Sequence, residues 1–138
     1  MTPATGSSIF PAIVAGEEGR VAIAYLRADS PLNPNHSAGP WFLHVMETTT
    51  GASEKPDWKD VLAADEQVHI GGVCSSGGGC FFGDGTGDRT LLDFIEICIV
   101  PTTGNTAIAY TVDPPMNGKQ PQIHVVLQKG GSPLLALR

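Results

Sequence analysis

The chain has 138 residues and a net charge of −6, and its eight Lys and Arg residues are scattered. A nucleic-acid partner would need a basic patch, which this distribution excludes. No apolar stretch reaches the ~18 residues that a membrane span requires, so none is predicted. With 17 Gly, 11 Pro and only 16% charged residues, the composition favours many short strands and turns.

In chain order, the first half predicts four strands, at 9–15, 20–27, 40–48 and 58–63. The first two read as a hairpin, because Gly16 and Gly19 supply turn conformations between them. A polar, proline-rich loop at 29–39 separates the second strand from the third. Residues 64–91 are the longest irregular stretch, which is uncommon unless such a loop is functional or pinned.

The second half predicts strands at 94–100, 105–112 and 122–128, and a stunted fourth strand within 132–138. This order repeats the first half. We therefore expect one unit over about 8–63, a linking cysteine loop at 64–91 and a second unit over about 92–138.

The repeat is visible in the residues themselves. Gly-Arg-Val-Ala-Ile-Ala-Tyr at 19–25 returns as Gly-Asn-Thr-Ala-Ile-Ala-Tyr at 104–110, and Leu-His-Val at 43–45 returns as Ile-His-Val at 123–125. Repeated units bury their apolar faces by stacking on their neighbours. The sequence thus predicts an all-β fold of about two four-stranded antiparallel sheets.

Four sequential antiparallel strands per unit are typical of a β-propeller blade. A sandwich of seven or eight strands is the alternative, although it predicts no repeat. Two blades form an incomplete ring unless they oligomerise. We therefore expect a homo-oligomer, with a trimer as the simplest closure, or a longer parent chain that supplies further blades.

The segments 8–16, 19–25, 39–45, 68–74 and 87–94, with Cys80, resemble the sialidase-like (BNR or Asp-box repeat) β-propeller proteins. The likeness covers nearly the whole chain and is to the two C-terminal blades of such a protein. It implies a six-bladed propeller, often on secreted or surface proteins, and hence an extracellular or cell-surface location and possible contact with a glycan.

Two departures from the family pattern bear on activity. The turn that matches an Asp box carries Thr50 where the Asp would be, with extra residues before Trp58, so the box is degenerate. A sialidase also implies three arginines that bind a carboxylate in bidentate fashion. The chain's four arginines assign no such triad; they are Arg20, Arg27, Arg89 and Arg138.

We therefore expect a non-catalytic module for assembly or glycan contact. The first alternative is a sialidase-type glycoside hydrolase, whose site other copies or missing blades complete; its acids would be Asp93, Glu96 and Asp113. The second alternative is a structural subunit of a surface layer or filament that adds strands at open sheet edges.

Cys74 and Cys80 bracket a Ser-Ser-Gly-Gly-Gly stretch that closes easily. A disulfide between them would pin the linking loop, stabilise the fold by roughly 2–2.5 kcal/mol and indicate an oxidising compartment. Zinc ligation is the rival reading, but the spacing does not match a zinc knuckle and no second pair exists. Cys98, in an isoleucine-rich strand, is expected to be a buried free thiol.

The segment 83–93 is the one dense polar cluster. Asp84 and Asp88 could offer oxygens to calcium, and no other cofactor is predicted. The alternative is an Asp/Gly turn in which Arg89 pairs with Asp88 or Asp93. Asp93 and Arg89 are the candidate ligand contacts, and the aromatic pair Phe81–Phe82 either stacks on a sugar or fills the seam between units.

Tyr25 and Tyr110 occupy equivalent repeat positions, as do His44 and His124. A residue present in each unit is more simply a packing element than a nucleophile or metal ligand. His69, in the linking loop, has no partner at metal-ligand spacing and is not predicted as a site.

Overall fold

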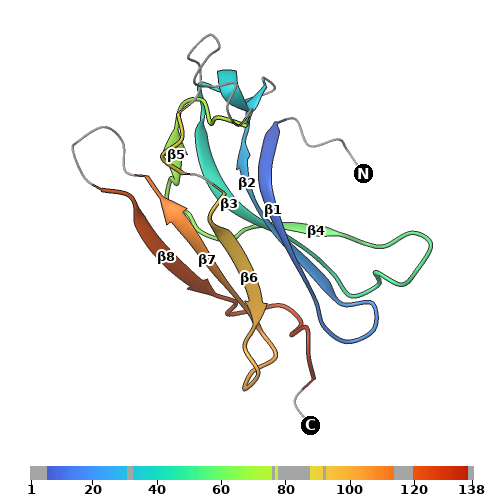
Figure 1. The fold of residues 1–138 in the computed structure, drawn as a ribbon. Coiled ribbons are helices and arrows are strands. Elements are labelled where there is room, and N and C mark those ends of the chain that lie inside the picture. The colour runs from blue at the N-terminus through green and yellow to red at the C-terminus, as the bar shows by residue number, and fades with distance from the viewer. Residues whose placement is uncertain are drawn as a thin grey trace.

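The computed structural model describes residues 6–30, 33–75, 77, 88–91, 93–113 and 120–136. They form two antiparallel β-sheets and one short 3-10 turn, so the chain is all-β (Figure 1). No helix in these ranges has the length and apolar character needed to cross a bilayer. The elements are β1 (Ser7–Ala15), β2 (Val21–Ala28), η1 (Pro34–His36), β3 (Pro40–Thr48), β4 (Lys59–Leu62), β5 (His69–Ile70), β6 (Ile95–Ile99), β7 (Thr106–Val112) and β8 (Gln122–Leu127).

The first sheet has the order β1-β2-β3-β4, and β5 pairs with the start of β3. Its four longer strands lie where the sequence predicts them, whereas the two-residue β5 was not predicted. In the turn between β3 and β4, Thr50 Oγ1 accepts a hydrogen bond from the N–H of Asp57 (2.9 Å). The hydroxyl of Thr50 therefore closes this turn.

The second sheet has the order β6-β7-β8, and the register pairs Tyr110 with His124 as the first sheet pairs Tyr25 with His44. The sequence repeat is therefore a structural repeat of three strands. The expected fourth strand is wrong for the described part of 132–138, because residues 132–136 form no strand.

Those residues instead join the two hairpin turns of the repeat. The N–H of Glu17 donates to the carbonyl of Leu134 (2.9 Å), and the N–H of Leu134 donates to the carbonyl of Gly104 (2.8 Å). Gly104 has φ +70, and a Cβ there would lie 2.0 Å from the carbonyl oxygen of Leu135. In the first turn, a Cβ on Gly16 would lie 2.1 Å from the carbonyl oxygen of Leu134. Glycine is therefore required at both turns, because the tail passes directly against their backbones.

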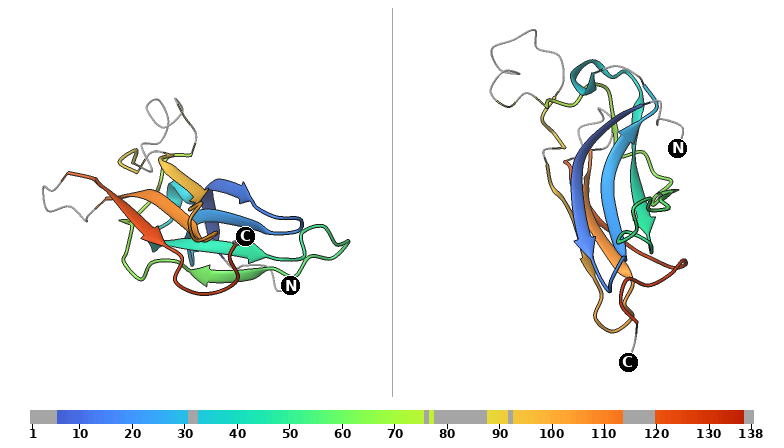
Figure 2. Two further views of the ribbon diagram at one scale, coloured as in Figure 1. Left: turned by 90° about the horizontal axis from the view of Figure 1, so that it is seen from below. Right: turned by 90° about the vertical axis from the view of Figure 1, so that its right-hand side faces the viewer.

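The two sheets pack on one another, with β6 against β1 and β2 (Figure 2). The first sheet contributes the side chains of alternate residues such as Ala24, Leu26 and Leu43 to the core, and the second contributes Ile108 and Tyr110. The repeat equivalents of Ala24 and Leu43 are Ala109 and Ile123, and neither belongs to this core. Opposite sides of the two equivalent sheets therefore meet.

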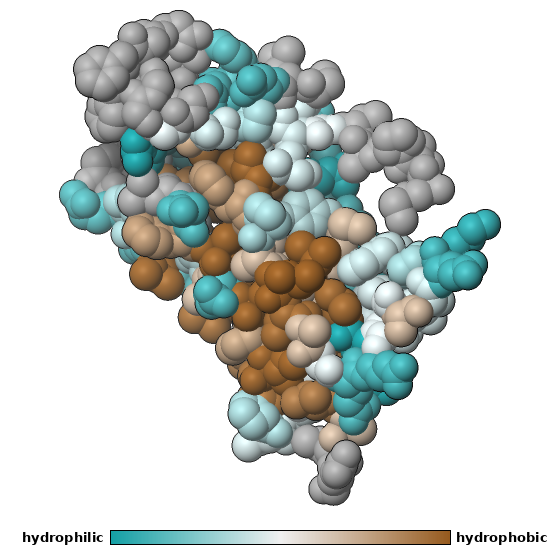
Figure 3. Space-filling view, turned by 45° about the vertical axis from the view of Figure 1, so that its right-hand side comes forward, coloured by the Kyte–Doolittle hydropathy of each residue, from teal (hydrophilic) through white to brown (hydrophobic). Residues whose placement is uncertain are grey.

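Among the described residues, one side of each sheet has no sheet packed against it. Leu43 is 0% exposed, whereas its repeat partner Ile123 is 73% exposed. The outer side of the second sheet thus carries a row of exposed apolar residues on β8, and Figure 3 shows that apolar side chains also gather in one extended area on the face that it displays. The row on β8 consists of Ile123, Val125 and Leu127.

The structure changes two expectations about which residues are buried. Cys98 is a free cysteine but is exposed, because the alternation of β6 places Ile97 in the core and its neighbours outside. The linking segment 64–91 contributes more than a connection, since Val68, Val73 and Leu91 are buried in the core.

Candidate functional site

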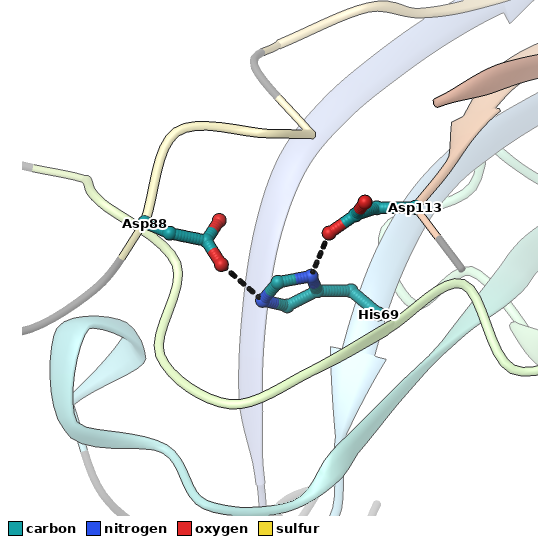
Figure 4. Close-up of side chains that lie close together, drawn as sticks. All are labelled: His69, Asp88 and Asp113. Atoms are coloured by element: carbon teal, nitrogen blue, oxygen red, sulfur yellow. Dashed lines mark hydrogen bonds and ion pairs between the residues drawn. The ribbon is translucent and has the colours of Figure 1, made fainter. Parts of the chain in front are cut away.

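His69, Asp88 and Asp113 form a cluster where the two sheets meet the linking segment (Figure 4). His69 opens β5, and its position is fixed by the register that pairs it with the buried Trp41 of β3. Asp88 forms an isolated parallel bridge with Val73. Asp113 follows the end of β7, and its N–H donates to the carbonyl of Val68 (2.9 Å).

The imidazole of His69 lies between the two carboxylates. Its Nδ1 is 3.1 Å from Asp113 Oδ2, which is a hydrogen bond. Its Nε2 is 3.5 Å from Asp88 Oδ2, and within the described part of the chain this buried nitrogen has no hydrogen-bond partner. The His69 side chain is 2% exposed, while that of Asp88 is 48% exposed. The cluster is therefore closed around the histidine and open to solvent at Asp88.

Thr90 joins the two carboxylates from the other side. Its Oγ1 lies 2.7 Å from Asp88 Oδ1 and 2.6 Å from Asp113 Oδ2. A hydroxyl has one proton, so it donates to only one of the two acceptors. The N–H of Thr90 also donates to Asp88 Oδ1 (3.1 Å), so Thr90 connects both carboxylates of the cluster.

The structure brings together two acids for which the sequence predicts different roles, Asp88 in calcium binding and Asp113 in catalysis. They meet at His69, which the sequence does not predict as a site residue. His69 and Asp113 are 44 residues apart, so no motif spacing connects them. Only the pairing of β5 with β3 and the end of β7 brings them into contact.

The predicted ligand contacts Arg89 and Asp93 line one pocket of about 240 Å³ beside this cluster, and Asp88 lines it too. Arg89 Nη1 donates to the carbonyl of Gly77 (3.2 Å). The other acid proposed for catalysis, Glu96, lies on the exposed side of β6 and does not line this pocket. Cys80, Phe81, Phe82 and Asp84 fall outside the described residues, so the disulfide with Cys74, the aromatic contact and the calcium pair with Asp88 stay predictions.

A tyrosine, a histidine and a carboxylate meet in each sheet. In the first sheet, His44 Nδ1 is 3.0 Å from Asp60 Oδ1, and the Tyr25 and His44 rings lie 5.8 Å apart. Burial, followed by the hydrogen bond to Asp60, raises the pKa of Tyr25 to about 12. Burial of the Asp60 carboxyl acts against its ionisation, yet the hydrogen bonds from His44 and Tyr25 hold its pKa below the usual value.

In the second sheet the carboxylate is Glu66, from the segment after β4. Tyr110 donates its hydroxyl proton to Glu66 Oε1, and His124 Nδ1 is 2.8 Å from the same oxygen. Burial and then this hydrogen bond raise the pKa of Tyr110 well above its ordinary value. The hydrogen bond from Tyr110 lowers the pKa of Glu66. Glu66 thus ties the end of the first sheet to the second.

The Tyr110 group lies on the wall of a larger groove, about 880 Å³, between the outer strands of the two sheets. Apolar side chains such as Val61, Ile108 and Leu127 make up most of its lining, and Glu47, Lys59 and Glu66 supply charges. The groove exists because the sheets are closest at β1 and β6 and leave space between β4 and β8.

Comparison of the chain with protein-family models, with curated proteins and with solved structures finds no match.

Proposed function

We propose that this chain is a non-catalytic, extracellular assembly module of the sialidase-like propeller type, two blades of a larger ring of sheets. The observation that carries the proposal is the packing of opposite sides of two equivalent sheets. A contact between two different surfaces is heterologous, so the same contact can be made again at each end of the pair.

The two uncovered sides correspond to the two halves of the existing contact. The outer side of the first sheet carries Ile13 and Ile23, which face as Ile108 does in the second sheet. The outer side of the second sheet carries Ile123 and Val125, the repeat equivalents of the buried Leu43 and Val45. A second copy can therefore place its first sheet on the second sheet of this one, as the first two sheets already pack.

The exposed side chains supply a driving force for that contact. Ile123, Val125 and Leu127 are each more than half exposed, and full burial of such a side chain stabilises by about 1.5–3 kcal/mol. The strands β4 and β8 are edge strands, and no other described strand pairs with their outer edges; proteins usually cover such edges. If the repeated rotation completes a full turn without a shift along the axis, the assembly closes into a ring, and three copies would give six sheets.

One observation favours the hydrolase alternative and three oppose it. Tyr110 and Glu66 form a hydrogen-bonded pair, and a tyrosine paired with an acid is what a sialidase nucleophile implies. Tyr110 is 1% exposed, however, and its raised pKa keeps the hydroxyl protonated. The same arrangement recurs at Tyr25, as expected for a packing element. We therefore assign both tyrosines to structure.

Glycan contact is the second candidate function, and the pocket that Asp88, Arg89 and Asp93 line favours it. A guanidinium and a carboxylate in one small pocket offer both a donor and an acceptor to sugar hydroxyls. Binding of the protein to an immobilised glycan panel, with Asp93→Asn and Arg89→Ala as variants, tests this. Glycan binding that both variants retain would contradict it.

Light scattering coupled to size-exclusion chromatography tests the assembly. We expect a discrete trimer, which Ile123→Lys abolishes because it places a charge on the outer side of the second sheet. Ile70→Lys is the matched control, since Ile70 is also exposed but belongs to β5. A monomeric wild-type protein contradicts the proposal, and open-ended polymers favour the filament subunit instead.

A mixing experiment distinguishes a head-to-tail contact from a symmetric one. Ile13→Lys blocks the outer side of the first sheet, and Ile123→Lys blocks that of the second. Each variant alone is expected to be monomeric. Mixed together they retain one intact contact, so we expect a heterodimer that grows no further. A mixture that remains monomeric would count against the heterologous contact.

A further inference from the structure

We propose that His69 and Asp88 bind a divalent transition-metal ion of the zinc class, and that Asp113 orients His69 for it. The site is separate from the sheet sides that the proposed assembly uses. It lies where β5 of the first sheet, the bridge at Asp88 and the end of β7 in the second sheet come together (Figure 4).

The distances from the two ring nitrogens of His69 to the two carboxylates indicate different roles for Asp113 and Asp88. His69 Nδ1 and Asp113 Oδ2 are 3.1 Å apart, a hydrogen-bond distance. His69 Nε2 and Asp88 Oδ2 are 3.5 Å apart, which is long for a hydrogen bond. Two ligand atoms that each bind one tetrahedral zinc ion at ~2.1 Å lie about 3.4 Å from each other. The Nε2–Oδ2 pair therefore has the separation of two ligands of one ion.

The hydrogen bond between His69 and Asp113 also supports His69 Nε2 as the metal ligand. Asp113 accepts a hydrogen bond from Nδ1, which places the lone pair of a neutral imidazole on Nε2. That nitrogen is buried and has no hydrogen-bond partner among the described residues, and Asp88 Oδ2 lies 3.5 Å from it. In this neutral form the lone pairs of Nε2 and Asp88 Oδ2 face each other, which is unfavourable. A metal cation between them removes the conflict, as a second proton on the imidazole would.

The arrangement of Asp113, His69 and the ion also matches a recurring design. Metal-binding histidines usually donate their second N–H to a carboxylate, which fixes the ring and raises its basicity. The Asp88 backbone is held as well, because its N–H donates to Gly72 (2.9 Å) and its carbonyl accepts from Cys74 (2.8 Å). Both proposed ligands are therefore in place before an ion binds.

The donor set selects the class of ion. One imidazole nitrogen and one carboxylate oxygen suit zinc and similar ions, whereas calcium takes six to eight oxygens. Asp88 also lines the pocket of about 240 Å³, which gives an ion a route from solvent and leaves room for water ligands. Because the site contacts both sheets, a bound ion is expected to raise the melting temperature.

Calorimetric titration of the chelator-treated full chain with zinc chloride tests the site, with calcium chloride titrated in parallel. We expect one zinc ion per chain, no comparable calcium binding, and an increase in Tm on zinc addition. Asp88→Asn is expected to abolish both the zinc heat and the Tm increase. Asp93→Asn, an acid in the same pocket but outside the cluster, is the matched control and should bind as wild type does.

Asp113→Asn tests the orienting role, and we expect zinc affinity to fall by about 10–100-fold, the usual effect of losing a carboxylate behind a ligand histidine. Circular dichroism of each variant verifies its fold. His69→Gln supplies a second ligand test if it folds. Absence of zinc binding by the wild-type chain, or zinc binding that Asp88→Asn leaves intact, would overturn the proposal.

Discussion

Tyr25 and Tyr110 hold the same position in the repeat, yet Tyr110 is part of the core between the sheets and Tyr25 is not. Tyr25 lies on the outer side of the first sheet, where His44 and Asp60 surround its ring. When sheets stack in the same orientation, two equivalent residues lie in different environments, one inside the stack and one on its outer side. A sandwich related by a two-fold axis would place both tyrosines inside or both outside.

The two turn glycines give a first prediction about stability. Gly104→Ala is expected to lower the free energy of unfolding by more than ~1 kcal/mol, because alanine is strained at positive φ and its Cβ would clash with Leu135. Gly130→Ala is the control, since nothing lies within 4 Å of its added Cβ. Urea denaturation followed by tryptophan fluorescence measures both. Equal effects of the two substitutions would show that the tail does not press against Gly104.

Leu134 gives a second prediction. Its side chain is 2% exposed and belongs to the core, so Leu134→Ala is expected to cost about 2–4 kcal/mol through lost burial and the cavity that remains. Ile70→Ala, at a half-exposed apolar residue, should cost less than about 0.5–1 kcal/mol. A Leu134→Ala protein as stable as Ile70→Ala would mean that residues 132–136 do not seal the core.

The tyrosines predict how stability depends on alkaline pH. The folded pKa of Tyr25 is raised to about 12, above the ~10 of an unfolded tyrosine. The stabilisation is therefore fully present below pH ~10 and is lost as the pH rises from there to about 12, since only the unfolded chain releases its proton in that interval. The urea midpoint should fall over this range.

Tyr25→Phe supplies the comparison for that measurement. Phenylalanine has no phenol to ionise, so the part of the alkaline decline that Tyr25 causes should vanish in this variant, while the part from Tyr110 remains. A wild-type midpoint that falls no more steeply than that of Tyr25→Phe would contradict the raised pKa.

The cysteines predict a thiol count. Of the three cysteines, Cys98 is free and exposed, and Cys74 is predicted to pair with Cys80. Protein made under oxidising conditions should therefore react with one equivalent of a thiol reagent in its native state, and with three after reduction and unfolding. Cys98→Ser should remove the native signal. Three reactive thiols before reduction would exclude the disulfide and the compartment inferred from it.

The strands could be predicted from the sequence because alternation and glycine turns act locally. Ile97 and Tyr110 lie in strands that a reader of the sequence can mark out. The side on which each strand is buried could not be predicted, since β2 is apolar on both sides: Ala24 and Leu26 face the core while Ile23 faces away. Only the packing of one sheet on another selects the buried side.

The candidate site was less accessible to sequence reasoning. Asp88 and Asp113 could be named as acids in informative positions, but their meeting at His69 depends on β5, a strand of two residues. Strands so short leave no periodic signal. The predicted strand in residues 132–138 is wrong for a related reason. The apolar residues 134–136 suit a strand, yet hydrogen bonds to Glu17 and Gly104 hold them across the turns.

Residues 132–136 contact the turns of both hairpins, and this contact also affects how the chain folds during synthesis. Leu134 reaches the turns at Gly16 and Gly104 only after the ribosome has made it and it has left the exit tunnel. Until then, either sheet can form its own ladder, but the seam between them stays unsealed at that end. A nascent chain arrested before this residue should therefore remain protease-sensitive, and a chain arrested after residues 132–136 have left the tunnel should be protected.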